Sequence, residues 1–273
     1  MATRSCTSSP SRWSPTDTMC LILFAHECHP NYRLILAANR DEFYDRPTAP
    51  AAFWEDEPSL LAGRDLKVGG TWFGITATGR LAAITNYRDP AVHRPNAPSR
   101  GLLVSDFLRN SLPAETFLAE LEPIGPTYNG FNLICGTREN LWHYSNRGGP
   151  PVPIPPGIHG LSNRLLDTPW PKVSRGTSAL AELLQHDRID PAELFAILAD
   201  RSMAPDPLLP DTGVGLERER LLSPLHIASP DYGTRSATVL LVGRDGWVEF
   251  TEQTFNGGVE PVTTVQQRFQ YAP

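Results

Sequence analysis

The chain has 273 residues, of which 40% are hydrophobic and 20% charged, and this balance excludes collagen, coiled coils and wholesale disorder. Its net charge of −6, from 24 basic and 30 acidic residues, argues against nucleic acid as the main partner, because nucleic acid favours a basic surface. The longest purely apolar run, residues 20–25, is far shorter than the roughly 20 residues of a membrane helix, so we expect no integral membrane segment.

The start of the chain differs in composition from the rest. Residues 1–18 are rich in Ser, Thr and Pro and lack periodic apolar residues. An organelle transit peptide, a disordered tail, and a true start at Met19 all fit this stretch. We favour the last interpretation, and expect a removable or misassigned leader over residues 1–19 and a single domain over residues 20–273.

The four cysteines, Cys6, Cys20, Cys28 and Cys135, are too few and too scattered for a disulfide framework in a chain of this length. A reducing compartment is therefore expected, and the cytoplasm is our prediction. A mitochondrial location applies only if residues 1–18 are a genuine leader.

Paired strands are predicted in the first part of the chain. The predicted strands are residues 20–26, 33–39, 71–77 and 80–86. The first two are joined by a turn at Pro30-Asn31 and the last two by a turn at Thr78-Gly79. Residues 39–42 are expected to close the second strand. The prolines expected in loops are Pro47, Pro50, Pro58, Pro90, Pro95 and Pro98.

Helix pairs alternate with further strands in the rest of the chain. The predicted helices are residues 101–110, 113–121, 171–185 and 190–200. The predicted strands are residues 131–136, 140–145, 158–163, 236–242 and 247–255. The fourth helix has a strong start signal, with Asp190 at the N-cap, Pro191 at the first position and Glu193 at the third. Residues 150–156 must be extended, because proline lacks the amide proton, and residues 205–230 are expected to form a loop.

This order of elements indicates an α+β fold. Because strands come in antiparallel pairs and helices in pairs, an alternating Rossmann or TIM arrangement is not expected. Helix pairs on the outside of stacked antiparallel sheets fit the order best.

Cys20 is the most informative residue of the sequence. If Met19 is the initiator and is removed, Cys20 carries both a thiol and the free α-amine, whose ordinary pKa values are about 8.5 and 7.7–8.0. The amine can then act as the base for the adjacent thiol. The alternative is that this cysteine is only a small hydrophobic residue at the head of an apolar strand.

Other polar residues stand at the ends of the predicted strands. Asp41 would lie beside the start of the first strand, where its carboxylate could orient the ammonium form of the Cys20 amine. Asn86 and Asn163 could donate to the oxyanion of a tetrahedral intermediate. Arg235 could anchor a carboxylate or orient the thiolate. The alternatives remain open: Asn39, Asp41 and both asparagines suit ordinary turns, and Arg235 suits the surface.

Four motifs then give a resemblance to a known family. They are AANRDEF at residues 37–43, GGTWFGI at 69–75, LAAITNYRDP at 81–90 and GLSNRLLDTPWPKV at 160–173. Together with the Met-Cys start they resemble the NRDE family, also called the transport and Golgi organisation protein 2 family. The resemblance runs through most of residues 19–255 and leaves residues 1–18 outside.

This family is in turn similar to N-terminal-nucleophile hydrolases of the bile-salt-hydrolase and penicillin-acylase type. The resemblance implies a four-layer αββα sandwich, with Cys20 as nucleophile and Asp41 near the α-amine. It also implies Asn86 and Asn163 toward the oxyanion hole and Arg235 as a late arginine. Ala37 and Ala38 stand where those hydrolases usually carry an arginine. Arg40 is the candidate substitute, although its side chain should point away from the face shared by Asn39 and Asp41. Asn39, Arg40 and Trp72 are expected as binding residues.

Metal and cofactor signals are weaker. His26, Cys28 and His29 cluster but lack a second ligand pair with convincing spacing, so a turn is favoured over a zinc site. No cofactor is required. Haem remains a candidate ligand, because family members are associated with haem trafficking and a His or Cys can ligate iron.

The function expected is hydrolysis of a non-peptide linear amide or an acyl thioester by Cys20. The rival hypothesis is a non-catalytic carrier that holds haem, a lipid or an acyl chain in the same cleft. A scaffold acting through proline-rich loops is the third, least favoured alternative.

Overall fold

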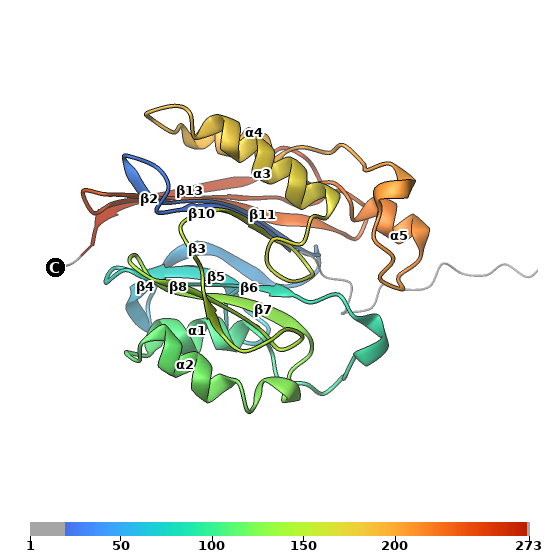
Figure 1. The fold of residues 1–273 in the computed structure, drawn as a ribbon, viewed down its shortest axis with the longest axis horizontal. Helices are drawn as coiled ribbons and strands as arrows, with labels where there is room; N and C mark the ends of the chain where they lie inside the picture. The colour runs from blue at the N-terminus through green and yellow to red at the C-terminus, as the bar shows by residue number, and fades with distance from the viewer. Residues whose placement is uncertain (1–19, 272–273) are drawn as a thin grey trace, which may run out of the picture.

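The computed structural model describes residues 20–271 and shows four layers, helix, sheet, sheet, helix, as Figure 1 shows. The order of the upper, six-stranded sheet is β10-β1-β2-β11-β12-β13, and the order of the lower, seven-stranded sheet is β3-β4-β5-β6-β7-β8-β9. All strand pairs are antiparallel. The expected αββα sandwich is confirmed.

The strands of the upper sheet are β1 (Cys20–His26), β2 (Tyr32–Phe43), β10 (Gly157–Leu161), β11 (Tyr232–Gly243), β12 (Trp247–Thr254) and β13 (Thr263–Gln270). Those of the lower sheet are β3 (Thr48–Trp54), β4 (Glu57–Asp65), β5 (Phe73–Thr76), β6 (Arg80–Asn86), β7 (Phe131–Thr137), β8 (Leu141–Ser145) and β9 (Val152–Pro153). The helices are α1 (Gly101–Arg109), α2 (Ala114–Leu121), α3 (Pro171–Leu183), α4 (Pro191–Leu198) and α5 (Leu216–Leu221).

Strand β1 shows why the sequence forms this sandwich. All seven of its residues are buried, because β1 pairs with β10 on one side and β2 on the other and is covered on both faces. Its side chains alternate between two cores. Ile22 and Phe24 enter the core between the sheets, whereas Leu21 and Leu23 enter the core under α3 and α4. An unbroken apolar run is what such a strand requires.

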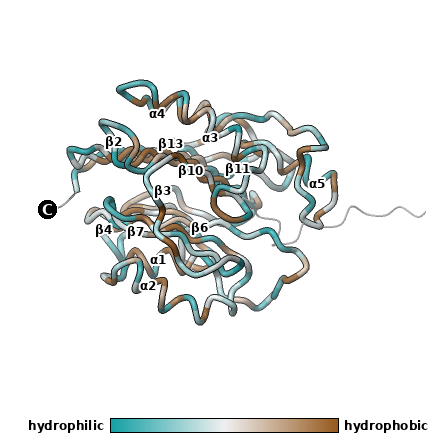
Figure 2. The backbone as a smooth tube through the Cα atoms, viewed as in Figure 1, coloured by the Kyte–Doolittle hydropathy of each residue, from teal (hydrophilic) through white to brown (hydrophobic). Residues whose placement is uncertain are grey.

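The helices cover the outer faces of the sheets. In Figure 1, α3 and α4 lie above the upper sheet and α1 and α2 below the lower one. The most apolar segments gather in the strands between them, as Figure 2 shows. The predicted N-cap of α4 is confirmed, since the Asp190 carboxylate accepts a 2.9 Å hydrogen bond from the amide of Ala192.

Most predicted strands and helices are confirmed within a few residues, including the hairpin turn at Thr78-Gly79, where Gly79 has a φ of 88°. Three predictions were wrong, and one strand was missed. Residues 39–42 do not close β2 but continue it to Phe43, and the loop expected around Pro50 and Pro58 is the hairpin of β3 and β4. The loop over residues 205–230 contains α5, and β13 was not predicted.

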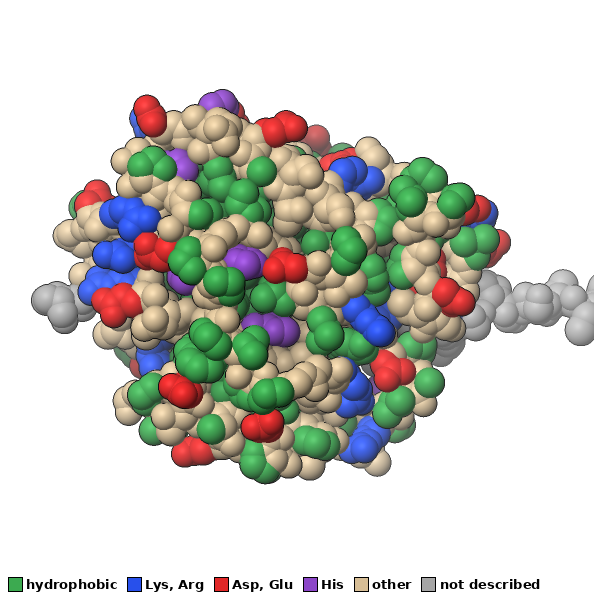
Figure 3. All heavy atoms as spheres, in the orientation of Figure 1, with side chains coloured by type: hydrophobic (Ala, Val, Ile, Leu, Met, Phe, Trp, Pro, Cys, Tyr) green, Lys and Arg blue, Asp and Glu red, His purple; other side chains and the backbone are tan. Residues whose placement is uncertain are grey.

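The expected leader, residues 1–19, lies outside the described residues. Among the helices of residues 20–271, none is long and apolar enough to cross a membrane. On the face drawn in Figure 3, acidic and basic side chains are interspersed.

Candidate active site

Cys20 lies at one end of the sandwich, on the wall of a pocket of about 810 Å³. It is the first residue of β1, and its backbone carbonyl accepts a 3.0 Å hydrogen bond from the Ser162 hydroxyl, which fixes the strand end. Directly across the sheet it pairs with Arg40, so both side chains lie on the same face. Other residues of the pocket wall include Glu42, Arg46, Asp65, Trp72, Asn86, His93 and Arg100.

The surroundings of Cys20 set the ionisation of its thiol. Burial raises the pKa of the thiol to about 12, and the nearby Asp41 carboxylate adds to the increase. Arg40 and a backbone hydrogen bond from Asp41 act in the opposite direction on this pKa. The thiol is therefore protonated near pH 7 and needs a base before it can act as a nucleophile.

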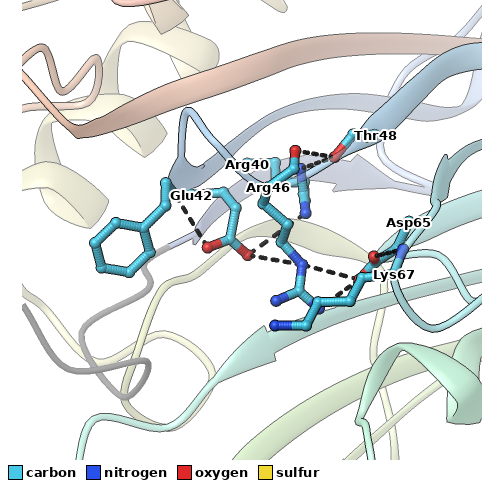
Figure 4. A network of polar contacts seen from close by, with 7 residues as sticks. Arg40, Glu42, Arg46, Thr48, Asp65 and Lys67 are labelled. Carbon is cyan, nitrogen blue, oxygen red and sulfur yellow. Dashed lines mark hydrogen bonds and ion pairs between the residues drawn. The ribbon is translucent and has the colours of Figure 1, made fainter.

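Several residues that line the same pocket as Cys20 form a network of ion pairs and hydrogen bonds, which Figure 4 shows. Glu42 lies between two guanidinium groups, 3.5 Å from Arg40 and 3.6 Å from Arg46. Arg46 also donates to one Asp65 oxygen at 3.0 and 2.7 Å, and Arg40 donates to the Thr48 hydroxyl at 3.3 Å. Because each charge has a counter-charge or hydrogen-bond partner, the network holds the Arg40 side chain near the thiol.

Arg100 is a pocket residue that the sequence analysis missed. It precedes α1, and its guanidinium donates to the Gly130 carbonyl at 2.9 Å. Burial lowers the pKa of Arg100 to about 10, whereas the negative forms of Cys20 and Glu42 act in the opposite direction, so this side chain interacts electrostatically with the nucleophile. Its position at a predicted helix start was the only signal available.

The side chains of Asn39 and Asp41 lie on the face of β2 opposite to Arg40, toward the helices, while Asp41 also forms part of the wall of the main pocket. Asp41 accepts a 2.6 Å hydrogen bond from the Thr234 hydroxyl, and burial raises the pKa of its carboxyl to about 6. Asn39 is fully buried and donates to the carbonyls of Leu198 and Leu225. Asn39 therefore links β2 to the end of α4 and to the backbone at Leu225, and it is not among the residues that line the pocket. As expected, Arg40 points away from these two residues.

The two asparagines proposed for the oxyanion hole occupy different positions. Asn86 lines the pocket at the end of β6. Asn163 is fully buried, and its side-chain amide donates to the Asn86 carbonyl at 2.9 Å while its oxygen accepts from Ser162 at 3.0 Å. Asn163 thus fixes the backbone of Asn86 and does not line the pocket.

Of Trp72 and Arg235, only Trp72 lines the main pocket. Trp72 lines the pocket and is 9% exposed. The two glycines that begin its motif serve different purposes: Gly69 has a φ of 81°, and a Cβ on Gly70 would lie 2.6 Å from the backbone of Gly101. Arg235 is the extra residue of a bulge in β11 and donates to the Phe255 carbonyl at 3.0 Å, so it borders a small cavity behind Arg40 and not the main pocket.

The expected turn near His29 is present. The His29 ring accepts from the amide of Asn31 at 3.1 Å, and its other nitrogen lies 3.0 Å from the His186 carbonyl. Across residues 20–271, no three His, Cys, Asp or Glu side chains are arranged to hold a metal ion.

Comparison with known proteins decides the family. The model of the family described as Transport and Golgi organisation 2 matches residues 19–257. The chain belongs to this family. The Transport and Golgi organization protein 2 homolog of Bos taurus is 42% identical over 260 residues, covering 88% of this chain and 94% of that protein. The homolog of Homo sapiens is 40% identical, covering 86% of this chain and 93% of that protein.

The solved structures similar to this member of the Transport and Golgi organisation 2 family include a conjugated bile acid hydrolase from Clostridium perfringens. It is 9% identical, with a TM-score of 0.50, and the match covers 94% of this chain and 97% of that one. This likeness shows that the fold is of the N-terminal-nucleophile hydrolase type.

Three buried charged residues were not singled out from the sequence, and two of them lie in the motifs that carry the family resemblance. Arg88 forms an ion pair with Glu219 of α5, and both are at most 4% exposed. Lys172, in the first turn of α3, is 2% exposed and lies within electrostatic range of Cys20, Asp41 and Arg88. Arg88 and Lys172 belong to the motifs at residues 81–90 and 160–173, which was the available signal.

Proposed function

We propose that this protein is a cysteine hydrolase that cleaves a non-peptide linear amide or an acyl thioester. The observation that carries the proposal is the position of Cys20, at the head of a central strand with Arg40 opposite and Asn86 on the same pocket wall. A pocket of about 810 Å³ suits a small-molecule substrate.

The mechanism requires that the bond between Met19 and Cys20 be cleaved. The α-amine released has an ordinary pKa of about 7.7–8.0 and can take the proton from the adjacent thiol, which burial otherwise keeps protonated. The Asp41 carboxylate, buried beside the strand end, would orient the resulting ammonium group.

The thiolate then attacks the substrate carbonyl, and the C–S bond forms as the carbonyl electrons move to oxygen. Asn86 stabilises this oxyanion, while Asn163 holds Asn86 in place through its backbone. The ammonium group protonates the leaving amine or thiol as its bond to carbon breaks. Water, deprotonated by the amine, attacks the acyl-enzyme thioester, releases the carboxylic acid and regenerates the thiol.

The experiment compares chains beginning at Cys20, chains that retain Met19, and the Cys20→Ala variant. Each is incubated with an acyl thioester and an N-acyl amide, and product release and intact mass are followed. Only the chain beginning at Cys20 should turn over substrate and carry an acyl group. Cys28→Ala, which removes an exposed thiol, is the matched control and should keep full activity. Equal turnover by the Cys20→Ala variant would refute the proposal.

We also propose the cytoplasm as the location of this protein. In the part of the chain that the structure describes, Cys20, Cys28 and Cys135 are all free thiols, which fits a reducing compartment.

A second candidate function is carriage of haem in the same pocket. His93 supports it, because this histidine lines the pocket and its Nδ1 is buried without a hydrogen-bond partner among residues 20–271. Titration with ferric haem should give a Soret band that His93→Ala shifts or abolishes, while His186→Ala, on an exposed histidine, leaves it unchanged. A band equally strong in the His93→Ala variant would remove the support for this candidate.

A further inference from the structure

Lys172 occupies an unusual position for a lysine. It is the second residue of α3, where the helix dipole disfavours a cation, and it is 2% exposed. A buried ammonium group is costly unless a counter-charge lies near it. The position therefore requires a compensating interaction at this end of the sandwich.

The acidic groups around Lys172 come from two elements. Glu219 of α5 is already paired with Arg88 and accepts a further hydrogen bond, at 3.0 Å, from the amide of Thr212. Asp41 of β2 is the larger favourable influence on the Lys172 pKa, which burial lowers to about 8. Asp41 is therefore the main counter-charge of Lys172.

Lys172 is in turn the main counter-charge of Asp41. Among the groups that favour ionised Asp41, Lys172 comes first, ahead of the hydrogen bond from Thr234 and the charge of Arg40. Glu42 acts in the opposite direction, and burial raises the pKa of Asp41 to about 6 in spite of all these groups. Without Lys172 this pKa would be higher still, and less of the carboxyl group would be ionised at pH 7.

The two groups do not form a direct ion pair. Lys172 Nζ and Asp41 Oδ2 are both buried, and neither has a hydrogen-bond partner among the described residues. Each is within electrostatic range of Cys20. The arrangement thus leaves Asp41 Oδ2 available to a further donor at the start of β1.

We propose that Lys172 is a positioning residue, whose buried ammonium group keeps the Asp41 carboxylate ionised so that it can accept a hydrogen bond from the α-amine of Cys20. The inference rests on the proposed function for the role of that amine. The positive charge of Lys172 also opposes protonation of the amine, and so favours the form that acts as a base.

The test measures the rate of Cys20 alkylation by iodoacetamide against pH, in chains beginning at Cys20 and carrying Cys28→Ala. Wild type should show a step near pH 6 that Asp41→Asn removes. Lys172→Met should move this step to higher pH, by about one pH unit, and Lys172→Arg should leave it in place. A step at the same pH in Lys172→Met, or none that depends on Asp41, would overturn the proposal.

Stability gives a second measurement in case Lys172→Met folds poorly. If the two charges compensate each other, Asp41→Asn should have different effects in the two backgrounds above pH 7. It should raise the urea midpoint more in the Lys172→Met chain than in wild type. Additive effects would contradict the coupling. Since alkylation and unfolding do not require turnover, failure of the hydrolase proposal would be seen separately.

Discussion

The two faces of β2 carry the same kinds of charge in opposite settings. On the pocket face, Arg40 and Glu42 belong to a network in which ion pairs and hydrogen bonds lie within 3.6 Å. On the helix face, Asp41 has one hydrogen bond, and its counter-charge, Lys172, acts on it without direct contact. Adjacent positions on one strand thus differ completely in how their charge is compensated.

This difference between the two faces of β2 indicates that the helix face is the part of the site that should respond to pH. On the pocket face, the closely paired charges hold the pocket wall in shape. On the helix face, burial shifts two pKa values toward neutrality, to about 6 for Asp41 and about 8 for Lys172, and each charge only partly offsets the shift of the other. Groups with such values are suited to proton transfer beside Cys20.

The largest expected effect comes from breaking the buried ion pair between Arg88 and Glu219 of α5. Glu219→Gln leaves Arg88 buried without its counter-charge, and we expect a loss of about 3–5 kcal/mol in the free energy of unfolding, measured with urea. Glu217→Gln, on the exposed side of the same helix, is the matched control and should change little. Equal, small effects would mean that this pair does not support the site.

A smaller effect is expected from Glu252, which is buried between the sheets and accepts a 2.7 Å hydrogen bond from the amide of Ala51. Burial raises its pKa to about 7, above the ordinary value of 4.5, so the folded state holds the proton more tightly than the unfolded chain. Stability should therefore fall as pH rises from about 4.5 to 7, by roughly 3 kcal/mol at most. Glu252→Gln should flatten this dependence in urea unfolding at several pH values, and an unchanged slope would contradict the assignment.

The smallest effect concerns reactivity on the pocket face. Arg40→Met removes the main cation that lowers the Cys20 thiol pKa, so alkylation of Cys20 at pH 8 should slow by up to roughly tenfold for each unit of pKa. Arg40→Lys, which keeps the charge, should retain most of the rate. If both variants react like wild type, the charge opposite Cys20 has no influence on the thiol.

Much of the fold follows from local sequence signals. The unbroken apolar run of β1 predicts a central strand, and the Asp190 cap predicts the start of α4. Strands β3 and β4 were missed because prolines were taken to mark loops. The structure places Pro50 on an edge strand, between the paired residues Ala49 and Ala52, where no ladder hydrogen bond is needed from it.

The site was only partly predictable. Cys20 and the alternation of β2 identified the nucleophile candidate and the opposite directions of Arg40 and Asp41. Lys172 and Glu219 could not be placed, because their proximity to Asp41 and Arg88 depends on how α3 and α5 pack against the sheet. Arg235 was expected at the site, but a bulge in β11 directs it toward the small cavity behind Arg40. The local sequence contains no signal that predicts this bulge.

Cys20 as an N-terminal nucleophile is tested most directly by intact-mass and peptide mass spectrometry, after the purified protein reacts with an acyl thioester. We predict a chain that begins at Cys20 and carries one acyl group on that residue, lost again as product is released. A chain that reacts while retaining Met19, or an acyl group found only on Cys28, would contradict it.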